Sequence, residues 1–266
     1  MAHTYESLTV SPPPPGPLDW NDEGVVILKN FMPEDLMVAY EDCWIANNAV
    51  GTRESFTMTS PMGWSYCTPY REHPEIADIL SYGPLHEVMQ GLVGEPVATH
   101  LNLTGWNTTA RNFHQDSYLN PKHVGDYYIA AWISLGTIHP DSGPFQYVPG
   151  SHRWPQVTHE KILSALEPHE RDHMWPKHSE RLLTELFEQE IENRGATVVD
   201  YLPNRGDVLL WHSRLLHRGS PAKIPGMERR GLIAHYSGIN HRQDMGPAYR
   251  HKDGWLFPID DPSRKK

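Results

Sequence analysis

Short apolar runs alternate with turn-forming residues over the second half of the chain. Gly, Pro, Asn and Asp separate the runs, which is typical of the strands of a β-sandwich or barrel. An earlier apolar run at 24–28 is also expected to form a strand. The other predicted strands lie at residues 97–104, 126–135, 145–148, 197–202, 207–212 and 229–237.

Two of these strands have faces of different character, because side chains alternate across a strand. In 126–135, one face is wholly apolar, and the other carries Tyr128, Trp132 and Ser134. In 229–237, Arg229 shares its face with Gly231, Ile233 and His235, and Arg230 lies on the opposite face. One face of each strand is therefore expected to pack in a core, and one arginine is expected to point inward.

Helical segments are expected mainly ahead of the strands. Residues 33–48 open with proline and two acidic residues, residues 74–93 are closed by a glycine, and residues 159–193 interrupt the strands. The fold class indicated is mainly β, with flanking α-helices. We expect one domain over 19–266, with a helical part at about 19–95 and a strand core at about 96–240 that contains a helical insertion at about 153–195.

Two segments lack any period. Residues 1–18 contain a proline run and are expected to form a disordered arm. Residues 51–72 are rich in aromatic residues, and they are either a lid over a pocket or a surface loop that packs its own aromatics.

Composition removes several functional classes. The formal net charge of the 266 residues is −10, which disfavours binding to nucleic acid or to an anionic membrane. No apolar run approaches the roughly 20 residues that cross a bilayer. The chain has only two cysteines and begins without a secretory pattern, so a cytoplasmic location is expected.

Histidine is unusually frequent, with 17 residues, and it is a common metal ligand. A His-x-Asp/Glu pair on a strand puts two ligands on one face, and a distant histidine can complete a facial triad for non-haem Fe(II). About two such pairs are expected by chance, given how often the candidate ligands occur. Five are present: His73/Glu75, His114/Asp116, His139/Asp141, His178/Glu180 and His251/Asp253.

Context favours His114 and Asp116. The pairs at 73 and 139 straddle a proline, the pair at 178 lies in a helical segment, and the pair at 251 has no histidine after it. His114 and Asp116 instead precede a series of strands, and His217 follows the strand at 207–212. Without further context, however, His114 and His217 are better explained as ordinary polar residues at strand ends than as metal ligands.

Four segments, in the same order, resemble the phytanoyl-CoA dioxygenase-like family of Fe(II)/2-oxoglutarate oxygenases. The similarity extends over about residues 113–236 and is weaker from residue 19 onward. The matching segments are 113–116 (FHQD), 141–152 (DSGPFQYVPGSH), 206–207 leading to 217–220 (HRGS), and Arg229 before a strand that ends near Tyr236.

The resemblance implies a double-stranded β-helix, the jelly-roll or cupin-like fold. It also implies iron held by His114, Asp116 and His217 and an arginine that binds the co-substrate 2-oxoglutarate. The family spacing selects Arg229 and Ser220 only if one residue is inserted after His217, because Gly219 and Glu228 occupy the usual positions. Further residues implied near the co-substrate are Gln115, Trp132, Asn102 and Thr104.

The expected activity is hydroxylation of an unactivated carbon in a small-molecule metabolite or natural-product intermediate. It consumes O₂ and 2-oxoglutarate, releases succinate and CO₂, and has ascorbate as a candidate reductant. Desaturation, cyclisation and epimerisation use the same oxidant and remain open. Halogenating relatives lack the carboxylate ligand, so Asp116 argues against halogenation. Alternatives from other classes are a non-catalytic cupin-like ligand-binding protein and a zinc hydrolase. The sequence predicts neither the substrate nor the oligomeric state.

Overall fold

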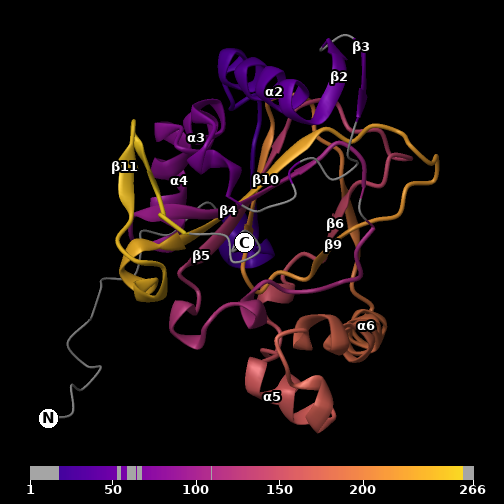
Figure 1. Ribbon diagram of the computed structural model, residues 1–266. Helices are drawn as coiled ribbons and strands as arrows, with labels where there is room; N and C mark the ends of the chain where they lie inside the picture. The colour runs from indigo at the N-terminus through magenta and orange to yellow at the C-terminus, as the bar shows by residue number, and fades with distance from the viewer. Residues whose placement is uncertain (1–17, 53–54, 59–63, 65–67, 109, 260–266) are drawn as a thin grey trace, which may run out of the picture.

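Two facing β-sheets, a two-stranded hairpin and flanking helices make up the structure, which is a computed structural model (Figure 1). It describes residues 18–52, 55–58, 64, 68–108 and 110–259. The expected proline-rich arm lies outside the described residues, except for Leu18, where the first helix begins.

The larger sheet has seven strands in the order β1-β8-β5-β10-β4-β12-β11. All its neighbouring strands are antiparallel except β12 and β4, which are parallel. The central strands β5, β8 and β10 are almost entirely buried. The strands are β1 (Val25–Leu28), β4 (Val97–Gly105), β5 (Tyr128–Ser134), β8 (Val208–His212), β10 (Gly231–Gly238), β11 (Tyr249–His251) and β12 (Gly254–Leu256).

The smaller sheet has the order β7-β6-β9, with β6 (Phe145–Tyr147), β7 (Val199–Tyr201) and β9 (His217–Gly219). An isolated antiparallel bridge between His114 and His217 extends it on the β9 side. The predicted strands are confirmed in place, although the sequence pattern misses β9, β11 and β12, which have three residues each and no clear alternation.

Three helices cover the outer face of the larger sheet: α2 (Glu34–Asn48), α3 (Pro74–Leu80) and α4 (Gly83–Val93) (Figure 1). The single helix predicted at 74–93 is wrong, because the chain breaks between α3 and α4. Pro84 lies in the first turn of α4, where its missing N–H is tolerated, and Tyr82 caps that helix with a non-helical backbone. The first helix, α1 (Leu18–Glu23), leads into β1.

The remaining helices, α5 (His159–Ala165) and α6 (Trp175–Arg194), lie beside the smaller sheet, away from α2 and α3 (Figure 1). The expected loop at 51–72 contains part of a hairpin, with strands β2 (Ala49–Thr52) and β3 (Ser55–Met58). Short 3-10 turns occur at Pro69–Arg71, Ser117–Leu119, Lys122–Val124, Ser151–Arg153, Pro168–Glu170, Ile239–His241 and Gln243–Met245.

The alternation of side chains divides the core into layers. Ile129, Ala131 and Ile133 of β5 pack with the helices, whereas Tyr128, Ala130 and Trp132 point between the two sheets. The space between the sheets is therefore lined by the mixed face of β5, as its sequence predicts. No described helix has the length and apolar character needed to cross a bilayer.

Candidate active site

His114 and His217 form an antiparallel backbone pair. Each backbone N–H donates to the carbonyl of the other residue, both at 3.0 Å. Residues paired in this way project their side chains on the same face, a few ångströms apart. The imidazole centroids lie 4.3 Å apart, so this one pairing joins two segments that are far apart in the sequence.

The ring orientations are set by backbone carbonyls. Nδ1 of His114 lies 2.9 Å from the Asn112 carbonyl, and Nδ1 of His217 lies 2.9 Å from the Leu215 carbonyl. Each Nδ1 therefore carries the proton, which leaves the Nε2 lone pair free to bind a metal.

Asp116 completes the group. Its carboxylate oxygens lie 4.0 Å from His114 Nε2 and 3.8 Å from His217 Nε2. All three ligand atoms are within 4.8 Å of one another, and all three residues are buried. Trp211 Nε1 donates to Asp116 Oδ2 at 3.1 Å, which fixes the carboxylate. The three side chains that the sequence pattern singles out are therefore brought together.

The electrostatics of this trio fit a cation. Burial lowers the pKa of His217, and that of His114 well below its usual value, so both rings are neutral near pH 7. Burial alone would raise the pKa of Asp116, but the neighbouring imidazoles of His217, His235 and His114 and the N–H of Trp211 favour the carboxylate form, and the pKa is lowered. Two neutral imidazoles and one carboxylate are the donor set typical of non-haem Fe(II) with open positions.

Arg229 is a buried guanidinium, only 5% exposed. Nη1 donates to the Gly143 carbonyl at 3.2 Å, Cζ lies 4.9 Å from the centre of the Trp132 ring, and Nε is buried without a hydrogen-bond partner. Burial lowers its pKa to about 10, so it stays charged near pH 7. Within the part of the chain that the structure describes, no carboxylate pairs with Arg229. The site therefore fits a carboxylate supplied by a ligand.

Arg230 has a different environment. It pairs with Glu228 at 2.7 Å and approaches Glu41 at 3.8 Å, and its guanidinium lies over Trp106. Its charge is thus balanced within the protein. Of the two arginines left open by strand alternation, Arg229 has the surroundings expected of a ligand-binding residue.

Ser220 lies close to the same segment as Arg229. Its Oγ donates to the Pro144 carbonyl at 2.8 Å, next to the Gly143 carbonyl that Arg229 contacts. In this arrangement the hydroxyl would have to rotate to donate to a ligand. The inserted residue assumed in the sequence comparison is consistent with both side chains meeting at 143–144.

Unpaired polar atoms lie near Arg229. Trp132 Nε1 and Tyr201 Oη are buried without a hydrogen-bond partner, and their rings are 5.7 Å apart. A Cβ at Gly231 would lie 1.8 Å from Trp132 Nε1, so only glycine permits this indole position. Buried donors are rarely left unpaired, and these two together with Arg229 suit a small dicarboxylate.

Three other residues that the family resemblance implies near the co-substrate do not lie with Arg229, Trp132 and Tyr201 in the structure. Gln115 donates to the Arg214 carbonyl at 2.6 Å and lines a cavity between α5 and α6. Thr104 is hydrogen-bonded to Tyr40 of α2, and Asn102 lies opposite Ala234, which packs with the helices. Thr104 and Asn102 share one face of β4, and that face is opposite to the side on which Trp132 projects.

The sequence pattern missed a polar pair beside the trio. The Tyr128 hydroxyl is hydrogen-bonded to His235 Nδ1, and His235 is close enough to Asp116 to affect its pKa. Burial lowers the pKa of His235 to about 4. Strand alternation could have predicted this pair, because His235 lies on the same strand face as Arg229, and Tyr128 lies on the same strand face as Trp132.

Comparison with protein families gives one assignment. The model of the family described as phytanoyl-CoA dioxygenase (PhyH) matches residues 73–231, which is more than half of the chain. The match includes the trio and Arg229. No curated protein matches the chain significantly.

Solved structures share the fold at low sequence identity. EctD from S. alaskensis, with bound Fe, has a TM-score of 0.57 and 17% identity, over 84% of this chain and 76% of that one. The α-ketoglutarate-dependent epimerase SnoN from nogalamycin biosynthesis has a TM-score of 0.58 and 16% identity, over 88% and 83%. The carbocyclase SnoK, from the same biosynthesis, has a TM-score of 0.53 and 16% identity, over 83% and 82%. These similarities confirm the jelly-roll fold.

Proposed function

The chain belongs to the phytanoyl-CoA dioxygenase family, and from this premise we propose that it hydroxylates an unactivated carbon of a small-molecule metabolite or natural-product intermediate. It is an Fe(II)- and 2-oxoglutarate-dependent dioxygenase, and we assign the iron to His114, Asp116 and His217. The observation that carries the assignment is the antiparallel pairing of His114 with His217, which places both imidazoles against Asp116.

Iron held there together with 2-oxoglutarate and O₂ would supply an oxidant that can remove hydrogen from an unactivated C–H bond, with succinate and CO₂ as the co-products. The protein's own part is to bind, to orient and to exclude water. Arg229 would bind the far carboxylate of the co-substrate, and Trp132 Nε1 and Tyr201 Oη offer further donors. Ser220 would contribute one directional hydrogen bond after rotation of its hydroxyl.

The surroundings of the trio keep its ligand atoms unprotonated and dry. Phe145 lies against the His217 ring with centroids 5.3 Å apart, and Trp211 lies at the same separation. These aromatic rings exclude water from one side of the trio, which strengthens its electrostatic interactions.

The direct test is succinate release from 2-oxoglutarate by the purified chain in the presence of Fe(II). Asp116→Ala should abolish succinate release, because the substitution removes both a metal ligand and the negative charge of the trio. Asp126→Ala is the matched control, since Asp126 is 57% exposed and pairs with Arg214 at the surface. Retained turnover in Asp116→Ala would remove Asp116 from the ligand set.

A second measurement separates the enzyme from a ligand-binding protein. Under anaerobic conditions, Fe(II) with 2-oxoglutarate should give a weak visible charge-transfer band. Metal-loaded protein that shows neither the band nor succinate release would favour a binding protein.

Product analysis then separates the reactions that share this oxidant. With candidate substrates that stimulate succinate release, hydroxylation adds one oxygen, desaturation or ring closure removes two hydrogens, and epimerisation leaves the mass unchanged. We expect a product with one added oxygen.

A further inference from the structure

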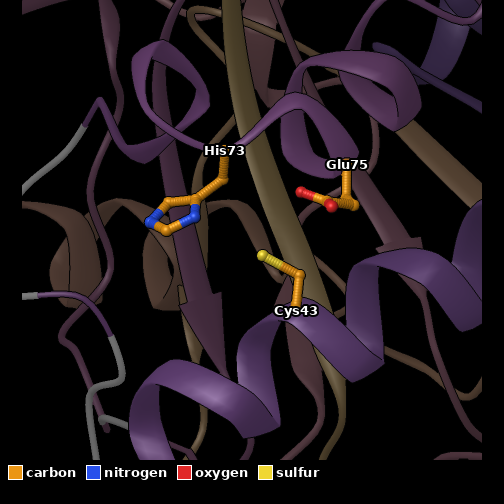
Figure 2. Close-up of side chains that lie close together, drawn as sticks. All are labelled: Cys43, His73 and Glu75. Atoms are coloured by element: carbon orange, nitrogen blue, oxygen red, sulfur yellow. The ribbon is translucent and has the colours of Figure 1, made fainter.

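A second group of metal-ligating side chains lies on the helix side of the larger sheet. Cys43 projects from α2 toward His73 and Glu75 at the start of α3 (Figure 2). One thiol sulfur, one imidazole nitrogen and one carboxylate oxygen all lie within 4.8 Å of one another. The sequence pattern set the His73/Glu75 pair aside, because a proline separates its members at a helix start. The tertiary structure supplies the third member.

The positions of these side chains are fixed by the packing of α2 against α3. Cys43 is partly buried and packs against the helix-side core. His73 has an extended backbone as the N-cap residue, Pro74 begins the helix, and Glu75 lies in its first turn. The Trp64 ring lies 4.5 Å from the His73 ring and limits its rotation. The ligands are therefore arranged before any cation binds.

The chemistry of this set differs from that of the iron trio. Sulfur, nitrogen and oxygen donors together suit a borderline-soft dication such as Zn²⁺, which binds Cys, His and carboxylate ligands in tetrahedral sites. A thiolate and a carboxylate carry two negative charges, so a bound dication leaves the group neutral. In the protein without a cation, the Cys43 thiol lies beside the Glu75 carboxylate. A cation would take the place of the thiol proton, which is released to solvent.

We propose that Cys43, His73 and Glu75 form a second metal site, which binds a divalent thiophilic cation of the zinc type, completes its coordination with water and clamps α2 to α3. Sulfur ligation distinguishes this site from the trio, which offers only nitrogen and oxygen. The two sites thus select different metals by ligand type. The clamp acts on the helices that cover the outer face of the larger sheet and takes no part in oxidation.

Cobalt is the probe that reports this site selectively. Co²⁺ bound to a thiolate gives an intense near-ultraviolet charge-transfer band, whereas Co²⁺ in the trio cannot, because the trio has no sulfur. Titration of the metal-free full-length protein should produce the band, and Zn²⁺ should displace it. The band should persist in Asp116→Ala, which lacks one iron ligand, and disappear in Cys43→Ser.

Matched variants complete the test. Cys67→Ser, which removes the other cysteine, should keep the band. Loss of an outer-shell partner already costs about 10–100-fold in metal affinity, so loss of a ligand in His73→Ala or Glu75→Gln should raise the dissociation constant for Co²⁺ by at least about 100-fold. Absence of the band in the unaltered protein, or its loss in Cys67→Ser with retention in Cys43→Ser, would overturn the proposal.

The outcome is independent of the iron chemistry. Cys43→Ser should keep the circular dichroism spectrum and Fe(II)-dependent succinate release of the unaltered protein, which shows that the variant is folded. A Zn²⁺-induced rise in Tm should occur in Asp116→Ala and be absent when Cys43→Ser is added to it. Equal Tm rises in both variants would also contradict the site.

Discussion

The unpaired charge of Arg229 gives the sharpest test of the co-substrate assignment. Replacing it with methionine keeps much of the side-chain length and removes the charge. Truncating one partner of a buried charge pair costs about 2–5 kcal/mol, and 1.4 kcal/mol corresponds to a factor of ten. We therefore expect Arg229→Met to weaken 2-oxoglutarate binding by about 30- to 4,000-fold.

In the ligand-free protein, Arg229→Met should leave the free energy of unfolding unchanged or raise it, although the same substitution weakens 2-oxoglutarate binding. The side chain of Arg229 donates to the Gly143 carbonyl and lies over the face of Trp132. Removing the guanidinium sacrifices a hydrogen bond worth about 1 kcal/mol and relieves the cost of burying a charge without a carboxylate. Arg229→Met should thus remain folded, which makes the binding result interpretable.

Ligand-induced thermal stabilisation is the assay, with the KM for 2-oxoglutarate in the succinate assay as a second readout. At a concentration 100 times Kd, a ligand stabilises the folded state by about 2.7 kcal/mol. For a chain of this size, that corresponds to a rise in Tm of roughly 5–10 °C. The rise should occur in the unaltered protein and be at most about a third as large in Arg229→Met at the same concentration.

Arg230→Met is the matched control. Arg230 pairs with Glu228 and lies over Trp106, so its loss should lower Tm without changing 2-oxoglutarate affinity by more than about threefold. If Arg230→Met abolishes the ligand-induced rise and Arg229→Met keeps it, the assignment of the inward arginine is wrong.

Three further results are expected. Trp211→Phe removes the donor to Asp116 Oδ2 and should weaken Fe(II) binding by about 10–100-fold in a metal titration, so an unchanged affinity would deny this tryptophan its orienting role. Gly231→Ala places a Cβ where the Trp132 indole lies and should raise the KM for 2-oxoglutarate more than it lowers kcat; a normal KM would show that the indole does not contact the co-substrate. Acidification from pH 7.5 to 5 should lower the free energy of unfolding, measured with urea, by up to about 1.4 kcal/mol per pH unit for each strongly buried histidine. Burial lowers the folded-state pKa of each such histidine below its unfolded value near 6.5, so the unfolded chain binds more protons than the folded chain as the pH falls. A free energy of unfolding that stays constant or rises on acidification would contradict this reasoning. These histidines are His86, with a pKa of about 4, His212, about 3, and His235, about 4.

Local patterns determined much of the fold. The alternating strands, the proline-led starts of α2 and α3 and the two-residue spacing of His114 and Asp116 are properties of neighbouring residues, and they appear in the structure where the sequence predicts them. Short strands such as β9 were missed, because three residues are too few to show an alternation. Pro84 is the residue in the sequence that marks the break between α3 and α4, because proline is favoured in the first turn of a helix.

Strand alternation alone could not decide which face points inward. Arg229 and Arg230 are neighbours with the same charge, and only the packed sheets show that one is buried beside Trp132 while the other reaches Glu228. The same limit applies to Thr104, whose contact with Tyr40 depends on where α2 packs. The resemblance to the family selected Arg229 by its spacing, but only the packed sheets show its buried surroundings.

Thus the sequence by itself determined the alternation of apolar and polar positions along the strands, the donor types of the iron trio and the family to which the chain belongs. Tertiary structure alone decided which distant groups meet: His217 with His114 through a backbone pair, and Cys43 with His73 and Glu75 through helix packing. The physical reason is that periodicity is set by bonded neighbours, whereas a binding site is set by contacts between segments whose sequence separation carries no information about their distance in space.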